Sequence, residues 1–280
     1  MEMLLLGSVF LVMGLVGLQW YRQRKKQRKR IYSTLELIGA IKKLISFTQK
    51  HRGLTATYLQ GDPSVETALR ELKQGIEELV NLLGKDTIVT DEARWIAYCD
   101  HWRRLKDKAL NLTVTTSFQQ HTHLIETLLY LLEDVAENVE FTHCTNATSH
   151  THFLWHEFPR VIEFVGQARA IGVAVSTRGE STQIDKVKLG YLCEKINILS
   201  NQSCERLSLV QTESTSEQIE QAKQACMQLT QTIQEQLINV TSVKLDNQRY
   251  FQLASTTMDK CNLVFDKEIN AIKLSYRKYN

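Results

Sequence analysis

Apolar residues recur every three or four positions along most of the chain, which is the period of a helix with one buried face. Polar breaks divide this pattern, from residue 31 onward, into segments that are each long enough for several helical turns. The predicted helices span 31–60, 63–83, 91–111, 117–142, 152–177, 183–210, 215–241 and 244–278. We therefore expect an all-α fold.

The breaks between these segments carry helix-boundary signals. Asp62 offers an N-cap acceptor, and Pro63 follows it in the first turn, where the missing N–H of proline costs nothing. The most loop-like stretch, 145–149, lies near the middle of the helical region and suggests halves of about 31–145 and 146–280. Short connections between long helices favour antiparallel neighbours and therefore up-down bundles.

The first 30 residues have a different pattern. Residues 3–21 contain no charge, and as a helix they would be roughly 28 Å long, close to the thickness of a bilayer's hydrocarbon core. Trp20 and Tyr21 end the run, where aromatic rings favour the headgroup layer. The alternative is a cleaved signal peptide, but no basic residue precedes the run and 17–19 is a poor cleavage site. We expect a retained transmembrane anchor.

Charge is distributed unevenly along the chain. Seven of its 34 basic residues lie in 22–30, and Glu2 is the one acid before them, so residues 31–280 hold 27 basic and 30 acidic residues. By the positive-inside rule, the basic cluster predicts a single-pass protein of the cytoplasmic (inner) membrane whose remaining chain lies in the cytoplasm. A slightly acidic body of this kind also argues against nucleic acid as a partner.

The composition fits the helical prediction. Two prolines and twelve glycines in 280 residues are too few turn residues for a many-stranded β fold. The six cysteines form no CxxC pair, and in the cytoplasm we expect them to be reduced thiols within the helix packing. No phosphate-binding loop, dinucleotide fingerprint or nucleophile elbow appears, so we predict neither an enzyme nor a cofactor.

Histidines cluster in the middle of the chain. The cluster consists of His121, His123, His143, Cys144, His150, His152 and His156. Imidazole and thiol ligands suit zinc or copper, but a spacing of two residues does not place two ligands on one helix face. We therefore predict solvated polar side chains and no metal site.

Two arginines lie on helix faces that are otherwise apolar. Residues 44–59 align weakly with residues 161–176 at a constant offset of 117, which matches Arg52 with Arg169. Arg52 follows Ile45 by seven positions, and Arg169 follows Val165 by four, so each shares a face with apolar residues. Burying an unpaired cation costs several kcal/mol, so each guanidinium must have a partner or reach water.

Two interpretations of these arginines are open. One is an internal salt bridge to an acid on a neighbouring helix, or a side chain that extends to the bundle rim. The other is a small anion held between helices, because a guanidinium offers a planar fork of donors to a planar oxyanion. Gly53, Gly166 and Gly172 lie near the arginines, and they would allow close helix approach or leave room for a ligand.

Three stretches resemble a known family. QKHRGLTATYLQGD (49–62), GQARAIGVAVSTRG (166–179) and YFQLASTTMDK (250–260) are similar to elements of the NIT domain, the nitrate- and nitrite-sensing module of bacterial receptors and antiterminators. The resemblance covers most of 31–280 and implies two packed four-helix bundles with the anion held at arginines between helices.

By this resemblance, Arg52, Arg169 and Arg249 are the ligand contacts. Arg249 has the weakest support, because only Leu253 indicates a buried face there. His51 departs from the family pattern, and Arg70 and Arg178 are reserve candidates on solvated faces.

Two functional hypotheses follow. The first is a membrane-anchored cytoplasmic sensor in which nitrate or nitrite draws arginine-bearing helices together. A partner protein or a second copy in a homodimer would read the shift, since no effector region follows the last helix. The second is an anchored helical scaffold whose arginines are locked in permanent salt bridges. A variant of the first binds another small oxyanion, such as formate or bicarbonate.

Overall fold

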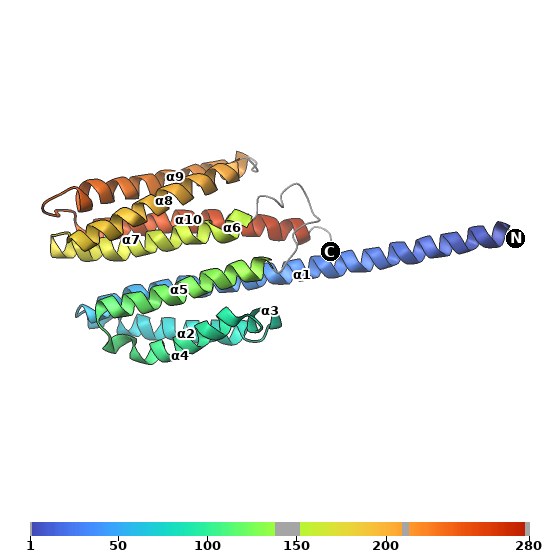
Figure 1. Ribbon diagram of the computed structural model, residues 1–280, viewed down its shortest axis with the longest axis horizontal. Helices are drawn as coiled ribbons and strands as arrows, with labels where there is room; N and C mark the ends of the chain where they lie inside the picture. The colour runs from blue at the N-terminus through green and yellow to red at the C-terminus, as the bar shows by residue number, and fades with distance from the viewer. Residues whose placement is uncertain (1, 138–151, 209–212, 278–280) are drawn as a thin grey trace.

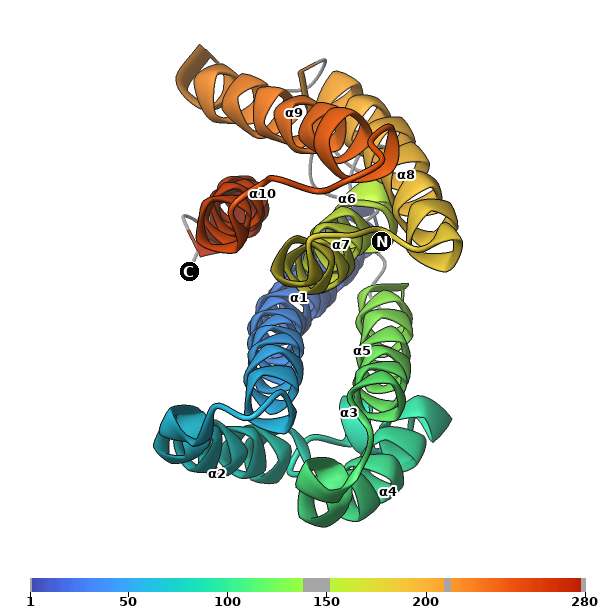
Figure 2. The same cartoon turned by 90° about the vertical axis from the view of Figure 1, so that its left-hand side faces the viewer.

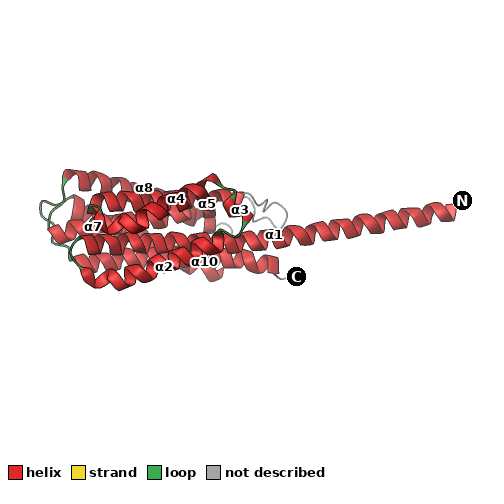
Figure 3. Ribbon diagram, turned by 90° about the horizontal axis from the view of Figure 1, so that it is seen from below, coloured by secondary structure: helices red, strands yellow, loops and turns green. Residues whose placement is uncertain are grey.

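A computed structural model describes residues 2–137, 152–208 and 213–277 of the chain. Within these ranges, the side chains of residues 2–12, 152, 213–215, 275 and 277 are not described. Every regular element in the described part is a helix or a helical turn, and no strand occurs there (Figure 3). The all-α prediction is therefore confirmed.

The first helix, α1, runs without interruption from Glu2 to Leu59 and so joins the predicted anchor, the basic segment and the first predicted bundle helix. Residues 22–30 contain only Arg, Lys and Gln, which are good helix formers, so nothing there ends the helix. The N-terminal half of α1 projects away from the other helices (Figure 1). From Ile31 onward, one face of α1 is buried against them.

No helix in the described part of the chain is both long enough and apolar enough to cross a membrane. The structure does not describe the side chains of residues 3–12 of the predicted anchor. The anchor therefore stays a prediction.

The first group of helices packs around the C-terminal half of α1. Asp62 caps the 3₁₀ turn Pro63–Val65, accepting a 3.0 Å hydrogen bond from the Ser64 backbone N–H as the sequence indicated. The other members are α2 (Glu66–Leu83), the short α3 (Thr87–Thr90), α4 (Ala93–Lys108) and α5 (Val114–Glu137).

The second group follows residue 151. It comprises α6 (His152–His156), α7 (Phe158–Arg178), α8 (Gln183–Ser208), α9 (Glu213–Ile233) with a π-helical turn at Gln234–Ile238, and α10 (Asn247–Arg277). The helix predicted at 152–177 is thus two helices. Pro159 lies in the first turn of α7, where its missing N–H prevents a continuous ladder from α6. The predicted division at 145/146 lies outside the described residues.

The two groups lie against each other with α1 and α7 at the centre (Figure 2). Contacts of α1 with α7 and α10, and of α5 with α6 and α7, join them, and their buried apolar side chains form one continuous core. On the outside, Lys42 on α1 pairs with Asp266 on α10 at 2.5 Å, and Lys273 on α10 pairs with Glu36 on α1 at 2.9 Å. The two arginine-bearing helices are therefore neighbours across this junction.

The cysteines that the structure describes are unpaired thiols, and most of them are buried; Cys144 lies outside the described residues. Burial raises the pKa of Cys193 and that of Cys204 to about 12 each, so both remain protonated at neutral pH. Cys226 and Cys261 approach each other across α9 and α10 with 3.7 Å between their sulfur atoms, without a disulfide.

Candidate ligand-binding site

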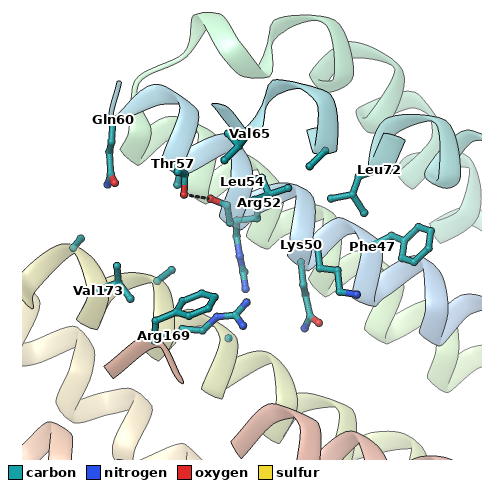
Figure 4. Close-up of a pocket in the computed structure, with 18 of the residues that line it drawn as sticks. Phe47, Lys50, Arg52, Leu54, Thr57, Gln60, Val65, Leu72, Arg169 and Val173 are labelled. Carbon is teal, nitrogen blue, oxygen red and sulfur yellow. Dashed lines mark hydrogen bonds between the residues drawn. The ribbon is translucent and has the colours of Figure 1, made fainter. Parts of the chain in front are cut away.

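A cavity of about 700 Å³ opens between the two groups of helices (Figure 4). Its walls come from the last turns of α1, the start of α2, the middle of α7 and the first turns of α10. Most of the lining is apolar, including Leu54, Leu72, Val173 and Phe251. Arg52 and Arg169 also line it, so the structure brings two of the three predicted ligand residues into one pocket.

Arg52 is almost completely buried, with 3% of its side chain exposed, and it is paired with an acid. Its Nη1 donates to Glu163 Oε1 at 2.5 Å, and its Nη2 donates to Glu163 Oε2 at 3.2 Å. Nη1 also donates to the Thr122 hydroxyl at 3.0 Å, and the guanidinium lies 5.1 Å from the centre of the Phe118 ring. For Arg52, therefore, the internal salt bridge is the correct interpretation in this state of the protein.

Glu163 on α7 was not singled out in the sequence, although it is 2% exposed and central to the site. Besides the two bonds from Arg52, its carboxylate accepts one from the Gln49 amide and one from the Gln167 amide, each at 2.9 Å. The sequence carried a signal for it, since Glu163 is the one acid within the apolar run 161–165. An acid in such a run either disrupts the buried face or has a cationic partner.

Arg169 has very different surroundings. It is partly buried, its Nη1 donates to the Ser255 hydroxyl at 2.9 Å, and its guanidinium lies 5.1 Å from the centre of the Phe251 ring. Within the described residues, no carboxylate lies at salt-bridge distance from it. Burial, and secondarily the charge of Arg52, lowers the pKa of Arg169, and the charges of Asp259 and Glu163, which lie beyond salt-bridge distance, oppose this shift only in part.

Figure 4 shows the two guanidinium groups directed into the same space, Arg52 from α1 and Arg169 from α7. With the Glu163 carboxylate, they form a cluster of net charge +1. Lys50 and Glu71 are exposed at the edge of the pocket and balance each other. One monovalent anion would therefore neutralise the cluster.

The three glycines near the arginines have different roles. A Cβ on Gly166 would lie 3.1 Å from Arg52 Nη2, so this glycine makes room for the guanidinium. A Cβ on Gly172 would lie 2.2 Å from the Tyr250 ring, so Gly172 allows α7 and α10 to approach closely. Nothing lies within 4 Å of a Cβ built on Gly53, which faces the open pocket.

Behind Arg52 lies a buried pair of histidines. His51 Nδ1 and His121 Nε2 are 2.8 Å apart, and His121 Nδ1 lies 2.7 Å from the Ser117 carbonyl oxygen. Burial lowers the pKa of His51 to about 4 and that of His121 to about 3, so both imidazoles are neutral at pH 7. The expectation of a solvated His121 was wrong, because α5 directs this residue into the first group's core.

The rest of the histidine cluster divides. His123 is exposed, His156 lies near Glu133 and Glu137, and residues 143, 144 and 150 lie outside the described part of the chain. No group of three or more potential metal ligands occurs in the described ranges.

Arg249 is not brought into the pocket. It is exposed in the first turn of α10, and its backbone N–H donates to Asp246 Oδ1 at 2.8 Å. It lines a second, more open hollow of about 730 Å³ that shares Val173 and Phe251 with the pocket. The reserve candidates are exposed as well: Arg70 pairs with Glu66 at 3.5 Å, and Arg178 pairs with Asp185 at 2.5 Å.

Comparison with protein families gives one match. The model of the NIT family, described as nitrate and nitrite sensing, matches residues 43–269. The chain belongs to the NIT family. The matched range contains α2 to α9, the end of α1 and most of α10, and therefore the whole pocket. Searches of curated proteins and of solved structures found no match.

Membership in the NIT family indicates the class of function of this chain. NIT domains are sensors and not catalysts, so nitrate and nitrite sensing in signalling is the role of this domain. Within the NIT domain described here, the pocket between α1, α2, α7 and α10 brings together two arginines and an apolar wall.

Proposed function

We propose that this NIT domain binds one nitrate or nitrite ion in the pocket between its two helix groups, with Arg169 as the principal ligand and Arg52 as the second. The observation that carries the proposal is the state of Arg169: partly buried, directed into the pocket and without a carboxylate partner in the described residues. A guanidinium is always charged, and its planar fork of N–H donors suits a planar oxyanion.

The charge of the site supports a monovalent ligand. The charges of Arg52 and Glu163 cancel, so the three-residue cluster keeps a net charge of +1 on Arg169, on which Asp259 acts only from beyond salt-bridge distance. An uncompensated charge away from water is unfavourable, and an anion that enters the pocket relieves this penalty. The largely apolar wall lowers the local dielectric constant relative to bulk water, which strengthens the attraction.

The position of the pocket supports a signalling mechanism. Its walls belong to helices of both groups, so a bound anion changes the forces between α1 and α7. The ligand can bias two packings only through its different affinity for them, about 1–3 kcal/mol for ordinary coupling. A partner protein, or a second copy in a homodimer, then reads the shift.

The same proposal places the sensor at the cytoplasmic membrane with its helical domain in the cytoplasm. It is supported by the uncharged run 3–21 and by the seven basic residues that follow it. The described side chains of the projecting helix include exposed Met13, Trp20 and Tyr21. A lipid bilayer would cover these apolar groups.

The scaffold hypothesis accounts for one of the two arginines. It expects permanent internal salt bridges, and Arg52 has one in Glu163. It provides no partner for Arg169, which hydrogen-bonds only to a hydroxyl among the described contacts. The sensor and scaffold hypotheses therefore make different predictions for Arg169.

A thermal-shift panel on the full-length chain tests the proposal. Nitrate and nitrite should raise the melting temperature, while chloride should not. A ligand at 100 times its dissociation constant adds about 2.7 kcal/mol of stability. Formate and bicarbonate belong in the panel because they probe other small oxyanions.

The Arg169→Ala variant should lose the nitrate shift. Arg70→Ala is the matched control, because Arg70 is exposed, forms an ion pair with Glu66 in its own helix and is not among the residues that line the pocket. If Arg169→Ala keeps the full nitrate shift, the assigned site is wrong. If no oxyanion shifts the wild-type protein, the scaffold hypothesis takes its place.

A further inference from the structure

We propose that Glu163 is a resident competitor of the ligand: its carboxylate holds the oxyanion position at Arg52 in the ligand-free protein, and nitrate or nitrite must displace it to reach Arg52. This inference rests on the function proposed above and adds its regulation. It makes Glu163 a residue that sets the affinity of the site.

The first argument is the set of donors around the Glu163 carboxylate. Four N–H groups converge on its two oxygens: two from Arg52, one from Gln49 and one from Gln167. Nitrate and nitrite are, like a carboxylate, flat anions whose negative charge is spread over oxygen atoms. A site with this fork of donors would therefore accept either anion in place of the carboxylate.

The second argument is the position of this set of donors. Arg52 and Arg169 line the same pocket, and Arg52 Nη2 lies 3.1 Å from the Cβ position of Gly166 in the helix turn that precedes Arg169. An anion bound at Arg169 is therefore close enough to attract Arg52 and to repel the carboxylate of Glu163. Binding of the anion and displacement of the Glu163 carboxylate from Arg52 are then two parts of one exchange.

The third argument is what the exchange would break. The Arg52–Glu163 pair joins α1 to α7 across the junction of the two groups, with side chains 3% and 2% exposed. The other α1 pairs that cross the junction, Lys42–Asp266 and Lys273–Glu36, have carboxylates 54% and 55% exposed, and exposed pairs contribute little. Displacing Glu163 would remove the buried ionic link between α1 and α7, while the pair of Arg160 on α7 with Glu133 on α5, at 2.7 Å, would still join the two groups.

The test makes the same Glu→Gln substitution at two positions of the full-length chain, one at the buried Arg52 pair and one on the pocket wall. Glu163→Gln removes the charge of the competitor and keeps its shape. Glu71→Gln is the matched control, because Glu71 is an exposed carboxylate on the pocket wall formed by α2. Nitrate affinity is measured for both variants and the wild type by isothermal titration calorimetry.

We expect Glu163→Gln to bind nitrate at least about tenfold more tightly than the wild type. A tenfold change in affinity lies within the usual range of coupling between sites. Glu71→Gln should stay within about twofold, because a solvated charge is largely screened. Equal or weaker nitrate binding by a folded Glu163→Gln protein would overturn the inference.

A second measurement does not depend on the folding of that variant. Difference infrared spectroscopy of wild-type protein labelled with ¹³C-glutamate reports any glutamate carboxylate whose hydrogen bonding changes. Nitrate should shift a glutamate carboxylate band in the wild type and in Glu71→Gln, and chloride should not. An unchanged band in wild-type protein that binds nitrate would also overturn the inference.

The outcomes separate this inference from the proposed function. If no version of the protein binds nitrate, the proposed function fails and the competitor with it. If the wild type binds nitrate and Glu163→Gln gains nothing, only the competitor fails. Nitrate binding in Glu163→Gln alone would support the competitor and contradict sensing by the wild-type chain.

Discussion

Arg52 and Arg169 occupy matched positions in two weakly similar segments, yet their surroundings are opposite. Arg52 is neutralised inside the protein by Glu163, whereas Arg169 faces the pocket with a hydroxyl as its hydrogen-bond partner. The repeat itself contains the reason, because Glu163 aligns with Ser46 at the offset of 117. Only the second segment carries an acid there, and this acid is used by the arginine of the first.

The comparison shows that an arginine on an apolar helix face is not by itself a ligand site. Its partner decides its role, and the partner comes from another helix. The same side chain forms a buried ion pair at one position, and at the other it faces a pocket with a hydroxyl as its described hydrogen-bond partner.

The largest expected effect is on folding stability. Arg52→Ala leaves the Glu163 carboxylate buried without its cation, which should lower the free energy of unfolding by about 3–5 kcal/mol. Arg169→Ala breaks no ion pair among the described contacts and removes one hydrogen bond to Ser255, so it should cost about 1 kcal/mol. Urea denaturation of the full-length variants measures both.

The double variant Arg52→Ala with Glu163→Ala serves as the control for the first change. It should recover much of the loss, because it leaves no unpaired charge in the core. Equal destabilisation by Arg52→Ala and Arg169→Ala would mean that the two arginines do not differ as described.

The next largest effect is a loss of stability at low pH, which we expect in the first helix group and not in the second. The folded-state pKa values of His51 and His121, about 4 and 3, lie below the ordinary value of 6.5. At a pH between the folded-state and the ordinary pKa of each histidine, the unfolded chain binds more protons than the folded one. The free energy of unfolding therefore falls as the pH drops below 6.5. At pH 5 the loss should be about 2 kcal/mol for each histidine relative to pH 7.5.

Urea denaturation at pH 7.5 and pH 5 measures this loss, and amide hydrogen exchange locates it. Exchange should rise at pH 5 in α1, α4 and α5 before it rises in α8 and α9. His121→Gln should remove about half of the pH dependence, while His123→Gln, at an exposed position of the same helix, should leave it unchanged. Stability that does not change between the two pH values would contradict the neutral histidine pair.

These contrasts also show what the sequence could and could not predict. The apolar period located the helices, Asp62–Pro63 located a boundary, and the shared faces of Arg52 and Arg169 placed both on the buried side. All of these are properties of a single helix. Periodicity does not show which side chain on a second helix lies opposite, so the pairing with Glu163 and the approach of His51 to His121 were missed.

The same limit explains Arg249. Its placement depended on resemblance, with Leu253 as weak support for a buried face, and α10 instead exposes it in its first turn. Tyr250, the next residue, takes the buried position and donates its hydroxyl to the Ala168 carbonyl oxygen at 2.8 Å. A shift of one residue on a helix rotates the side chain by about 100°, which is enough to move it from core to solvent.

The smallest effects compare a glycine that lines the pocket, Gly53 on α1, with one at the contact of α7 and α10, Gly172. Gly172→Ala would place a methyl group against the Tyr250 ring, which is fully buried and held by its hydrogen bond, so it should destabilise the protein by about 1–3 kcal/mol. Gly53→Ala meets open space in the middle of a helix and should stabilise by about 0.5–1 kcal/mol. Urea denaturation measures both changes.

Because the new methyl group of Gly53→Ala would enter the pocket beside Arg52, this variant should also show a smaller nitrate thermal shift despite its higher stability. An undiminished shift would mean that the space at Gly53 is not used by the ligand.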